Sequence, residues 1–414
     1  MWLGQIVSEV GDHFNTIAVL SLALHVTGSG AAVGGVMIAR TLPAILAAPV
    51  AGVILDRMDR RKIMIASDLV RAVVAALFVL VLTLQQEWLL YPLSAMLMFA
   101  SPFFSSGRSA ILPKITTAEE LHTANALTQT TSWLTLTFGA MLGGLAAVQF
   151  GYETSFLLNT FSFLFSAFAI WKLYSPDGFR AERVEVEAHA VRRGRFWTDF
   201  NESLIYIRRT PLILAILLAG VGWATGGGAA QILYTLFGEL VYKRGPAGIG
   251  LIWGFAGVGL VLGGVVGHRL GNRLSYGQYL HAVWINFLIH GLSYVFFSLG
   301  DLLSGICFIA LSRVAMGANN VQNRTMLLTH IPDYLRGRVF STAEAMNNAT
   351  MMISMSVASI ATMHYSPRQI GFVAGLFSTF TALPWAWATF AGKLPEPRRE
   401  TAEDIIEESP ITPA

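Results

Sequence analysis

The stretch that decides the fold is a dense cluster of charge between two long apolar runs: Gly52-Val53-Ile54-Leu55-Asp56-Arg57-Met58-Asp59-Arg60-Arg61-Lys62. Apolar residues dominate positions 33–55 and 63–84 on either side of it. The charges between Asp56 and Lys62 cannot lie in hydrocarbon, because each costs about 2.5–3.5 kcal/mol at the centre of a membrane helix. Two or three residues at most lie outside regular structure. We therefore predict two antiparallel membrane helices joined by a tight charged turn at a membrane surface.

The composition extends this conclusion to the whole chain. Of 414 residues, 54% are hydrophobic and only 13% are charged, against about 25% charged in ordinary soluble domains. Continuous apolar runs recur at the length of about 20 residues that crosses a bilayer, without the alternation of a β-barrel. The net charge of +3 gives no indication of a nucleic-acid partner, and the single cysteine, Cys307, excludes an intrachain disulfide. The sequence predicts an all-α integral membrane protein.

Twelve spans are predicted, six on each side of a hydrophilic segment. They cover residues 2–26, 33–55, 63–84, 88–106, 126–148, 155–174, 211–238, 248–269, 277–298, 302–322, 339–363 and 368–391. The corresponding units are an N-terminal bundle (1–174), a linker (175–210), a C-terminal bundle (211–392) and a disordered tail (393–414). The linker has a charged part, 180–195, and an amphipathic helix from Phe196 to Ile207. The first span is too long and too charged for a signal peptide, and it starts so early that we expect a short lead-in before Met1.

Lysine and arginine predict the orientation. With the N-terminus inside, the outward loops hold only Lys243, Arg244 and Arg368. The inward loops and tails hold the rest of the loop cations, including Arg57, Arg60, Arg61, Lys62, Arg108, Lys114, Arg269, Arg273, Arg324, Arg336, Arg338 and Lys393. The excess of positive charge on one side predicts that both termini are cytoplasmic.

The two halves of the chain repeat. Residues 52–61 align without gaps on residues 264–273, and the glycine, the valine and both outer arginines are retained. A second match joins residues 108–112 to residues 324–328. Duplicated halves around a midplane site are typical of secondary transporters.

The charged turn resembles the loop between spans 2 and 3 of the major facilitator superfamily. Its Asp59-Arg60-Arg61 form, Gly11-Asp12 in span 1 and the approach to span 7 over 196–211 are similar to the branch that holds macrolide-efflux and enterobactin-exporter-like proteins. The resemblance covers residues 1–393. It implies the major facilitator fold, two pseudo-symmetric six-helix bundles in the bacterial inner membrane.

The resemblance also implies a gate at the charged turn. It suggests that Asp56 contacts the start of span 11 near Arg338 and latches the cytoplasmic side in the outward-open state. Because His268 stands in the position of Asp56 in the second half, the latch is one-sided. The residues assigned to this gate and loop motif are Gly52, Asp56, Arg57, Arg60, Arg61, Arg338 and Glu344.

Charged residues inside the predicted spans are the best guide to mechanism. Asp12 lies about 15 Å from the cytoplasmic end of span 1, and Arg40 of span 2 lies about 20–24 Å from it. We expect an Asp12–Arg40 pair, or a cluster of Glu9, Asp12 and Arg40, that switches on protonation; a static buried pair is the alternative. Asp68 and Arg71 are expected near the interface, paired with each other or with the charged turn. Arg313 in span 10 is either a cavity residue or a helix-packing residue.

Three glycines of span 5, Gly139, Gly143 and Gly144, resemble the antiporter motif of family exporters. Ala140 stands where that motif usually has proline, so the expected helix kink is in doubt. The resemblance implies an export role, and ordinary packing of small residues between helices is the alternative.

The remaining patterns narrow the function class. The sequence has no Gly-x-x-x-x-Gly-Lys phosphate loop and no Cys/His cluster, so neither ATP drive nor a metal is expected. No catalytic constellation indicates an enzyme. We expect a monomeric secondary transporter without cofactor that uses the proton gradient to export an amphipathic small molecule, such as a drug, a macrolide-like compound or a siderophore. An importer or lysophospholipid-type transporter of the same fold, or a non-transporting sensor, is the alternative.

Overall fold

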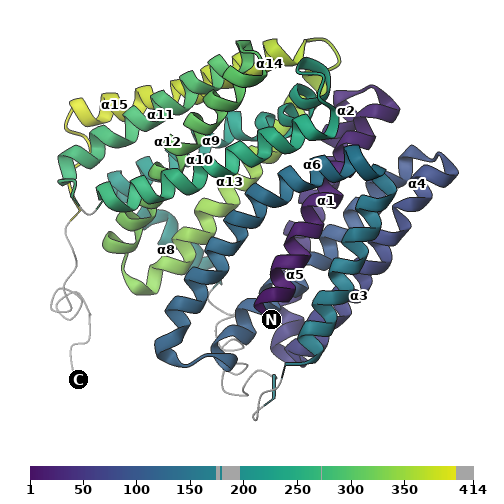
Figure 1. Cartoon of the computed structure of the whole chain (residues 1–414). Helices are drawn as coiled ribbons and strands as arrows, with labels where there is room; N and C mark the ends of the chain where they lie inside the picture. The colour runs from purple at the N-terminus through teal and green to yellow at the C-terminus, as the bar shows by residue number, and fades with distance from the viewer. Residues whose placement is uncertain (174–177, 180–195, 272, 398–414) are drawn as a thin grey trace.

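The computed structural model describes residues 1–173, 178–179, 196–271 and 273–397, and all regular structure in these residues is helical (Figure 1). The charged linker part at 180–195 and the last residues of the tail, 398–414, lie outside the described residues. The linker helix is described as α8, over Phe196–Arg209.

Residues 1–173 form the first group of helices, called the N half below. They are α1 (Trp2–Thr27), α2 (Gly30–Arg57), α3 (Arg60–Leu77), α4 (Val79–Leu84), the short 3₁₀-helix η1 (Glu87–Leu89), α5 (Leu90–Ile115) and α6 (Ala118–Trp171).

The helices from residue 211 onward form the C half. They are α9 (Pro211–Leu236), the π-helical turn η3 (Phe237–Val241), α10 (Gly245–Gly271), α11 (Tyr276–Leu299), α12 (Leu302–His330), α13 (Asp333–Ala361), α14 (Pro367–Phe380) and α15 (Ala382–Phe390).

The described helices make twelve crossings. The helix α6 counts twice because its backbone leaves helical geometry at Gly151 (φ 82°, ψ 170°) and the chain reverses there. The pairs α3–α4 and α14–α15 each form one crossing, and the helix α9 crosses together with η3. Nine of the described helical segments are long and apolar enough to span a membrane by themselves. The predicted all-α membrane fold is confirmed.

Local sequence explains the tight turns. Gly28 ends α1 in the left-handed region (φ 63°), and Ser29 then caps α2 by accepting a hydrogen bond from the Ala31 N–H. At the charged turn, the Asp59 carboxylate accepts from the Lys62 N–H and caps α3. The helices α2 and α3 run antiparallel as predicted, but α2 packs mainly against α5, and α3 packs against both α5 and α6, rather than against each other.

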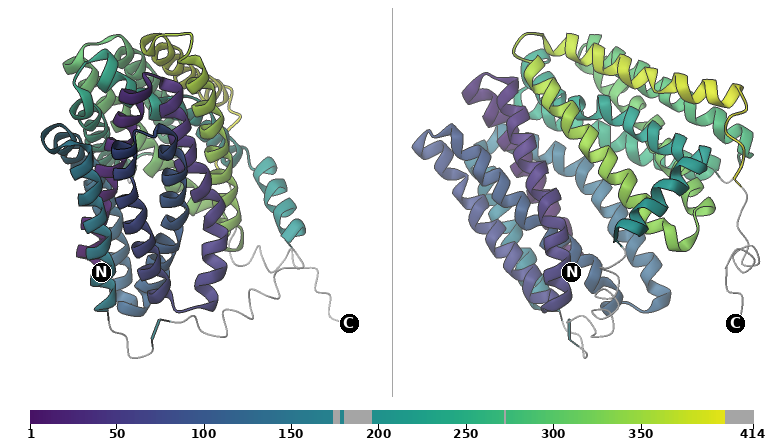
Figure 2. Two further views of the ribbon diagram at one scale, coloured as in Figure 1. Left: turned by 90° about the vertical axis from the view of Figure 1, so that its right-hand side faces the viewer. Right: turned by 180° about the vertical axis from the view of Figure 1, so that it is seen from behind.

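The two ends of the molecule differ. One end, called the basic end below, holds Met1, the turn at residues 57–60, α8 and the last described residues (Figures 1 and 2). The opposite end, called the far end, holds the turns at Gly28 and Gly151. Figure 2 shows the helices of the two halves diverging from the far end toward the basic end.

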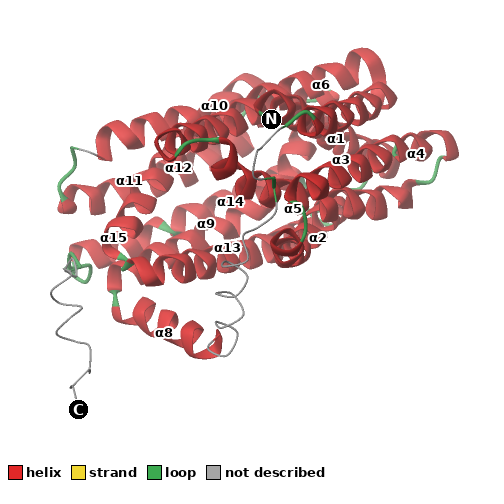
Figure 3. Cartoon of the chain, turned by 90° about the horizontal axis from the view of Figure 1, so that it is seen from below, coloured by secondary structure: helices red, strands yellow, loops and turns green. Residues whose placement is uncertain are grey.

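The halves meet through three sets of helices. The helix α6 packs against α10, α2 against α13 and α9, and α1 against α9 and α10 (Figure 3). The second set is close at the far end, where a Cβ atom added to Gly34 would lie 2.2 Å from Ser359 Oγ. The Ser359 hydroxyl also donates to the Ala31 carbonyl across the halves, at 3.2 Å. The structure is therefore closed at the far end.

Candidate functional site

The polar residues that the sequence singled out in the N half lie in one region of α1. Glu9 and Asp12 project from this helix, about 10 and 15 Å along it from its start, and their side chains keep 23% and 27% exposure. We call Glu9, Asp12, Arg40, Arg71 and Arg108 the N-half charge cluster. It brings together α1, α2, α3 and α5.

Glu9 is fully supplied with hydrogen-bond donors. Its Oε1 atom accepts from Arg108 Nη1 at 3.0 Å, from Gln5 Nε2 at 2.9 Å and from Ser132 Oγ at 3.1 Å. Its Oε2 atom accepts from Thr135 Oγ1 at 2.6 Å. Donors from α1, α5 and α6 therefore converge on this carboxylate.

Asp12 is poorly supplied by comparison. Its Oδ2 atom lies 3.7 Å from Arg71 Nη1, which is an ion-pair distance rather than a hydrogen bond. Its buried Oδ1 atom has no hydrogen-bond partner among the described residues. Two carboxylates one turn apart on α1 therefore have opposite environments.

The direct Asp12–Arg40 pair expected from the sequence is wrong. Arg40 instead donates to Asn15 Oδ1 at 3.1 Å and to Thr16 Oγ1 at 2.8 Å. Both acceptors lie one turn beyond Asp12 toward the far end, because the arginine side chain does not span the axial offset between the two helices. Arg40 acts on Asp12 through its charge, and the Thr16 hydroxyl that it contacts donates to the Asp12 backbone carbonyl at 2.7 Å.

Arg71 takes the position expected for Arg40. Asp68 and Arg71 pair with each other as predicted, but the expected place near the interface is wrong, since Asp68 is completely buried. The helix α3 begins at Arg60, so Arg71 lies about 16 Å along it. Its guanidinium stacks between the rings of Phe104 and Phe163, 4.7 and 4.4 Å from their centroids. Counting from Arg60 rather than from the first apolar residue would have indicated this depth.

Arg313 lies in the C half and is buried. Its Nε atom donates to the Tyr234 hydroxyl at 3.0 Å, which ties α12 to α9. The guanidinium also lies 5.6 Å from the centre of the same ring. Of the two interpretations left open by the sequence, this geometry favours helix packing.

The charged turn binds mainly within its own half. Arg60 Nη1 donates to the Ala110 carbonyl on α5 at 2.9 Å, and Arg61 Nε donates to the Ile170 carbonyl at the end of α6 at 3.1 Å. These contacts fix the start of α3 and satisfy a carbonyl at a helix terminus.

The remaining gate residues lie at the basic end, where the halves diverge. Asp56 is half-exposed, and no ion pair between it and the start of α13 is found among the described residues, while Arg57 and Glu344 are exposed. A Cβ atom added to Gly52 would touch nothing within 4 Å. The latch suggested for the outward-open state therefore stays a prediction.

The glycines of span 5 pack against two different partners. Cβ atoms added to Gly139 and Gly143 would lie 2.9 Å from the His13 ring and 3.1 Å from the His13 carbonyl of α1. One added to Gly144 would lie 2.5 Å from the Pro246 carbonyl at the start of α10. The helix shows no break at Ala140, so the kink of a proline-containing motif is absent here. These three glycines let α6 approach both α1 and the opposite half closely.

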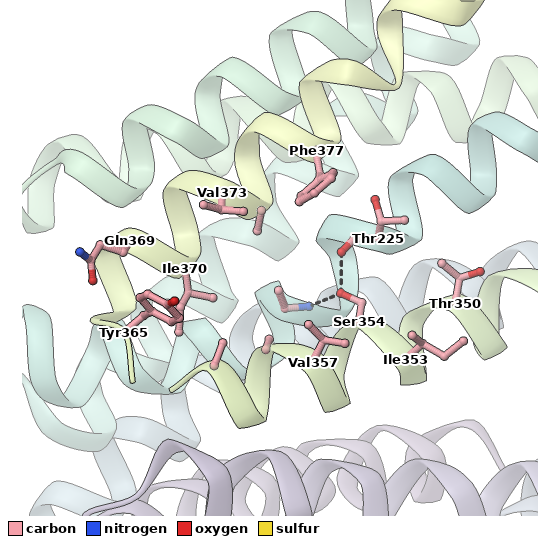
Figure 4. A pocket seen from close by; sticks show the side chains of 14 residues that line it. Thr225, Thr350, Ile353, Ser354, Val357, Tyr365, Gln369, Ile370, Val373 and Phe377 are labelled. Atoms are coloured by element: carbon pink, nitrogen blue, oxygen red, sulfur yellow. Dashed lines mark hydrogen bonds between the residues drawn. The ribbon is translucent and has the colours of Figure 1, made fainter. Parts of the chain in front are cut away.

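A concave apolar surface lies elsewhere, between α13 and α14 with α9 as its floor (Figure 4). Its volume is about 450 Å³, and no charged side chain lines it. The Ser354 hydroxyl projects into this floor, donates to the Thr225 carbonyl at 2.5 Å and accepts from the Ala229 N–H at 3.0 Å. These are two groups that pair with each other in a regular helix, so the side chain inserts into the backbone ladder of α9.

Comparison with known proteins identifies the family. The sequence profile of the Major Facilitator Superfamily matches residues 1–354. The chain belongs to the Major Facilitator Superfamily. It is therefore a multi-pass membrane transporter and not an enzyme.

Several relatives within the superfamily are named for export or efflux. The chain is 26% identical over 349 residues to a putative bacilysin exporter, BacE, of Bacillus subtilis, with 83% of each chain covered. It is 19% identical over 367 residues to macrolide efflux protein A of Streptococcus pyogenes, covering 87% of this chain and 88% of that one. The resemblance to the macrolide-efflux branch is confirmed.

The fold agrees with solved members of the superfamily. A crystal structure of a bacterial homologue of the iron transporter ferroportin in an inward-facing state superposes with a TM-score of 0.70 at 16% identity, over 93% of this chain and 97% of that one. At this identity the likeness concerns the fold alone.

Proposed function

We propose that this facilitator-family transporter is a proton-coupled antiporter that exports an amphipathic small molecule, such as a drug, a macrolide-like compound or a siderophore, by alternating access. It works as a monomer without cofactor in the bacterial inner membrane, driven by the proton gradient. The names of its relatives support the direction of transport. The cations of the basic end support a cytoplasmic position for both termini.

The observation that carries the proton assignment is the contrast between Asp12 and Glu9. Four donors lie within hydrogen-bond distance of the Glu9 carboxylate oxygens. Asp12 has one ion-pair contact at 3.7 Å and one buried oxygen without a partner. When a carboxyl takes a proton, an oxygen that accepts no hydrogen bond loses little stabilisation. Asp12 is therefore the acid that exchanges protons. Glu9 positions α1 against α5 and α6.

The consequence of protonation follows from the contacts of Arg71. A neutral Asp12 no longer attracts this guanidinium, which then pairs with Asp68 alone. The net charge of the side chains between α1, α2 and α3 then rises by one unit. This change occurs at Asp12, one helical turn from the residues that Arg40 contacts. Because α1 and α2 also contact the C half through α9, α10 and α13, this change in field biases the packing of the two halves.

The test is transport in inside-out membrane vesicles, where an imposed proton gradient drives accumulation of an exporter's substrate. A panel containing a macrolide, a peptide antibiotic, a cationic dye and a catecholate siderophore is screened first. Collapse of the gradient should abolish accumulation. Asp12→Asn should lose uphill accumulation and its pH dependence while it retains downhill exchange.

Matched variants sharpen the assignment. Glu9→Gln should reduce transport without removing its dependence on the proton gradient, and Asp301→Asn, an exposed acid in a far-end turn, should behave as wild type. Uphill accumulation by Asp12→Asn with unchanged pH dependence would refute the proton assignment. Accumulation only in right-side-out vesicles would show an importer instead.

A further inference from the structure

The far-end closure contains one acidic contact that the sequence patterns did not single out. Several inter-half contacts there involve glycines, including Gly144 against Pro246 and Gly34 against Ser359. The acidic contact joins α1 and α6 of the N half to η3 of the C half through Ser21, Tyr152 and Glu239.

The three side chains form a directed chain of hydrogen bonds. The Ser21 hydroxyl, which is completely buried, donates to Glu239 Oε1. It also lies 2.9 Å from the Tyr152 hydroxyl. A serine has a single proton to donate, so with this proton on Glu239 the tyrosine must be the donor to serine. The chain therefore runs from Tyr152 to Ser21 and ends on the carboxylate.

The backbone holds Glu239 firmly in this position. It lies in the π-helical turn η3, where the Tyr242 N–H bonds to the Phe237 carbonyl at 2.8 Å. A Cβ atom added to Gly238 would lie 2.4 Å from the Ile249 nitrogen, so η3 packs backbone to backbone on α10. Wide turns of this kind inside helices are frequently found at functional sites.

The surroundings of Glu239 contain several cationic or titratable groups. His25 lies one turn beyond Ser21 on α1 and acts on the Glu239 carboxylate electrostatically, as does the Tyr152 phenol from α6. Lys243 and Arg244 follow in the turn to α10. From α14, which packs against η3, Arg368 donates to the carbonyls of Ser298 and Gly300. Among these groups, His25 is the one whose charge acts on the Glu239 carboxylate and favours its ionised form.

We propose that Glu239 is the latch of the far-end gate: its ionised form holds α1 and α6 to η3, and a proton arriving from the far-end side releases them. A hydrogen bond to a carboxylate is about twice as strong as one to a neutral acceptor, so protonation weakens the only charged link across this gate that the described residues show. The inference rests on the proposed alternating access, in which the far end faces outward.

The test measures the opening of the far end by electron spin resonance in reconstituted protein, without substrate or gradient. Since Cys307 is the only cysteine, Cys307→Ser gives a clean background for spin labels at Glu87→Cys and His364→Cys. Both positions are exposed far-end residues, one on each half. Distances are recorded at pH 7.5 and pH 5.5.

Wild type should show a short distance at pH 7.5 and a growing long component at pH 5.5. Glu239→Gln should show the long component already at pH 7.5, with the open-to-closed ratio raised about five- to tenfold, and no further response to pH. Tyr152→Phe, which removes only the hydroxyl, should shift the ratio in the same direction by less. Glu153→Gln, an exposed neighbouring acid, is the matched control and should equal wild type.

Two results would overturn the latch. One is a distance distribution for Glu239→Gln and Tyr152→Phe that equals that of Glu153→Gln at both pH values. The other is a full pH response that persists in Glu239→Gln, which would assign the proton to another group. Because the distances need no transported substrate, failure of the Asp12 transport experiment and failure of the latch are separate outcomes.

Discussion

Replacing Arg71 by methionine removes the partner of a completely buried carboxylate. Asp68 has no exposed surface, and Arg71 has 2%. Breaking a buried pair from one side costs about 3–5 kcal/mol, because the remaining charge stays buried without compensation. Methionine keeps the contact with the Phe104 and Phe163 rings. The loss of stability therefore measures the removal of the charge and not the formation of a cavity. We expect Arg71→Met to destabilise the N half by about 3–5 kcal/mol.

The double variant Asp68→Leu/Arg71→Met separates charge from packing. Replacing both partners of a buried pair by apolar groups is often neutral or stabilising, so the double variant should recover most of the loss. At a slope of about 2 °C per kcal/mol, the single variant should melt about 6–10 °C below wild type. The assay is thermal unfolding in detergent followed by loss of the monodisperse peak on size exclusion.

The expected signature is a double-mutant cycle with a large coupling energy. Additive losses in the double variant, or a single Arg71→Met variant as stable as wild type, would refute the assignment of Arg71 as the charge that neutralises Asp68. Transport by the double variant is a further readout, since Asp12 then loses its ion-pair partner while the fold is retained.

Three more predictions concern single positions. Gly144→Val should force the far ends of the halves apart, because its Cβ atom would lie 2.5 Å from a backbone carbonyl of α10. The spin-label distances check this, and Gly277→Ala, whose Cβ atom would meet nothing within 4 Å, is the control. Ser354→Ala should slow hydrogen exchange at the turn of α9 into which its hydroxyl inserts, whereas Ser356→Ala, whose hydroxyl bonds within its own helix, should not. Hydrogen bonds from the residue three positions on hold the pKa of Asp301 below its ordinary value of 3.8. Its contribution to stability should therefore be full above that pH and disappear as the pH falls through the lowered pKa, so the melting temperatures of wild type and Asp301→Ala should converge in acid.

The sequence predicted the membrane fold because apolar length and the positions of turn residues are local properties. Twelve crossings follow from run lengths near 20 residues, and the turn at Gly28 follows from a residue type that adopts a positive φ. The repeat at residues 52 and 264 also holds in three dimensions, since both glycines lie near the basic-end termini of the second helix of their half.

The details of the site depend on axial offsets that the sequence leaves open. The residues Asp12, Arg40 and Arg71 lie on three helices, and a shift of one turn decides which arginine meets the carboxylate. The apolar pattern sets a helix end only to within a few residues, and an error of three residues moves a side chain by about 4.5 Å. The depth of Arg71 was missed for this reason. Glu239 was missed because it lies at the end of an apolar run, where a single acid is ordinary for a helix terminus.

The positions of the proposed Glu239 latch and of the predicted Asp56 latch argue for a division of work between the halves. Asp56 ends the second helix of the N half at the basic end, and its counterpart His268 in the C half carries no carboxylate. Glu239 lies at the far end, on the C half, and binds across to the N half. On the proposed topology each half thus contributes one acid to one gate, and the gates lie on opposite sides of the membrane. A proton from outside weakens the far-end latch without touching the one at the basic end. The order in which the two gates open therefore follows from the compartment that each carboxylate faces.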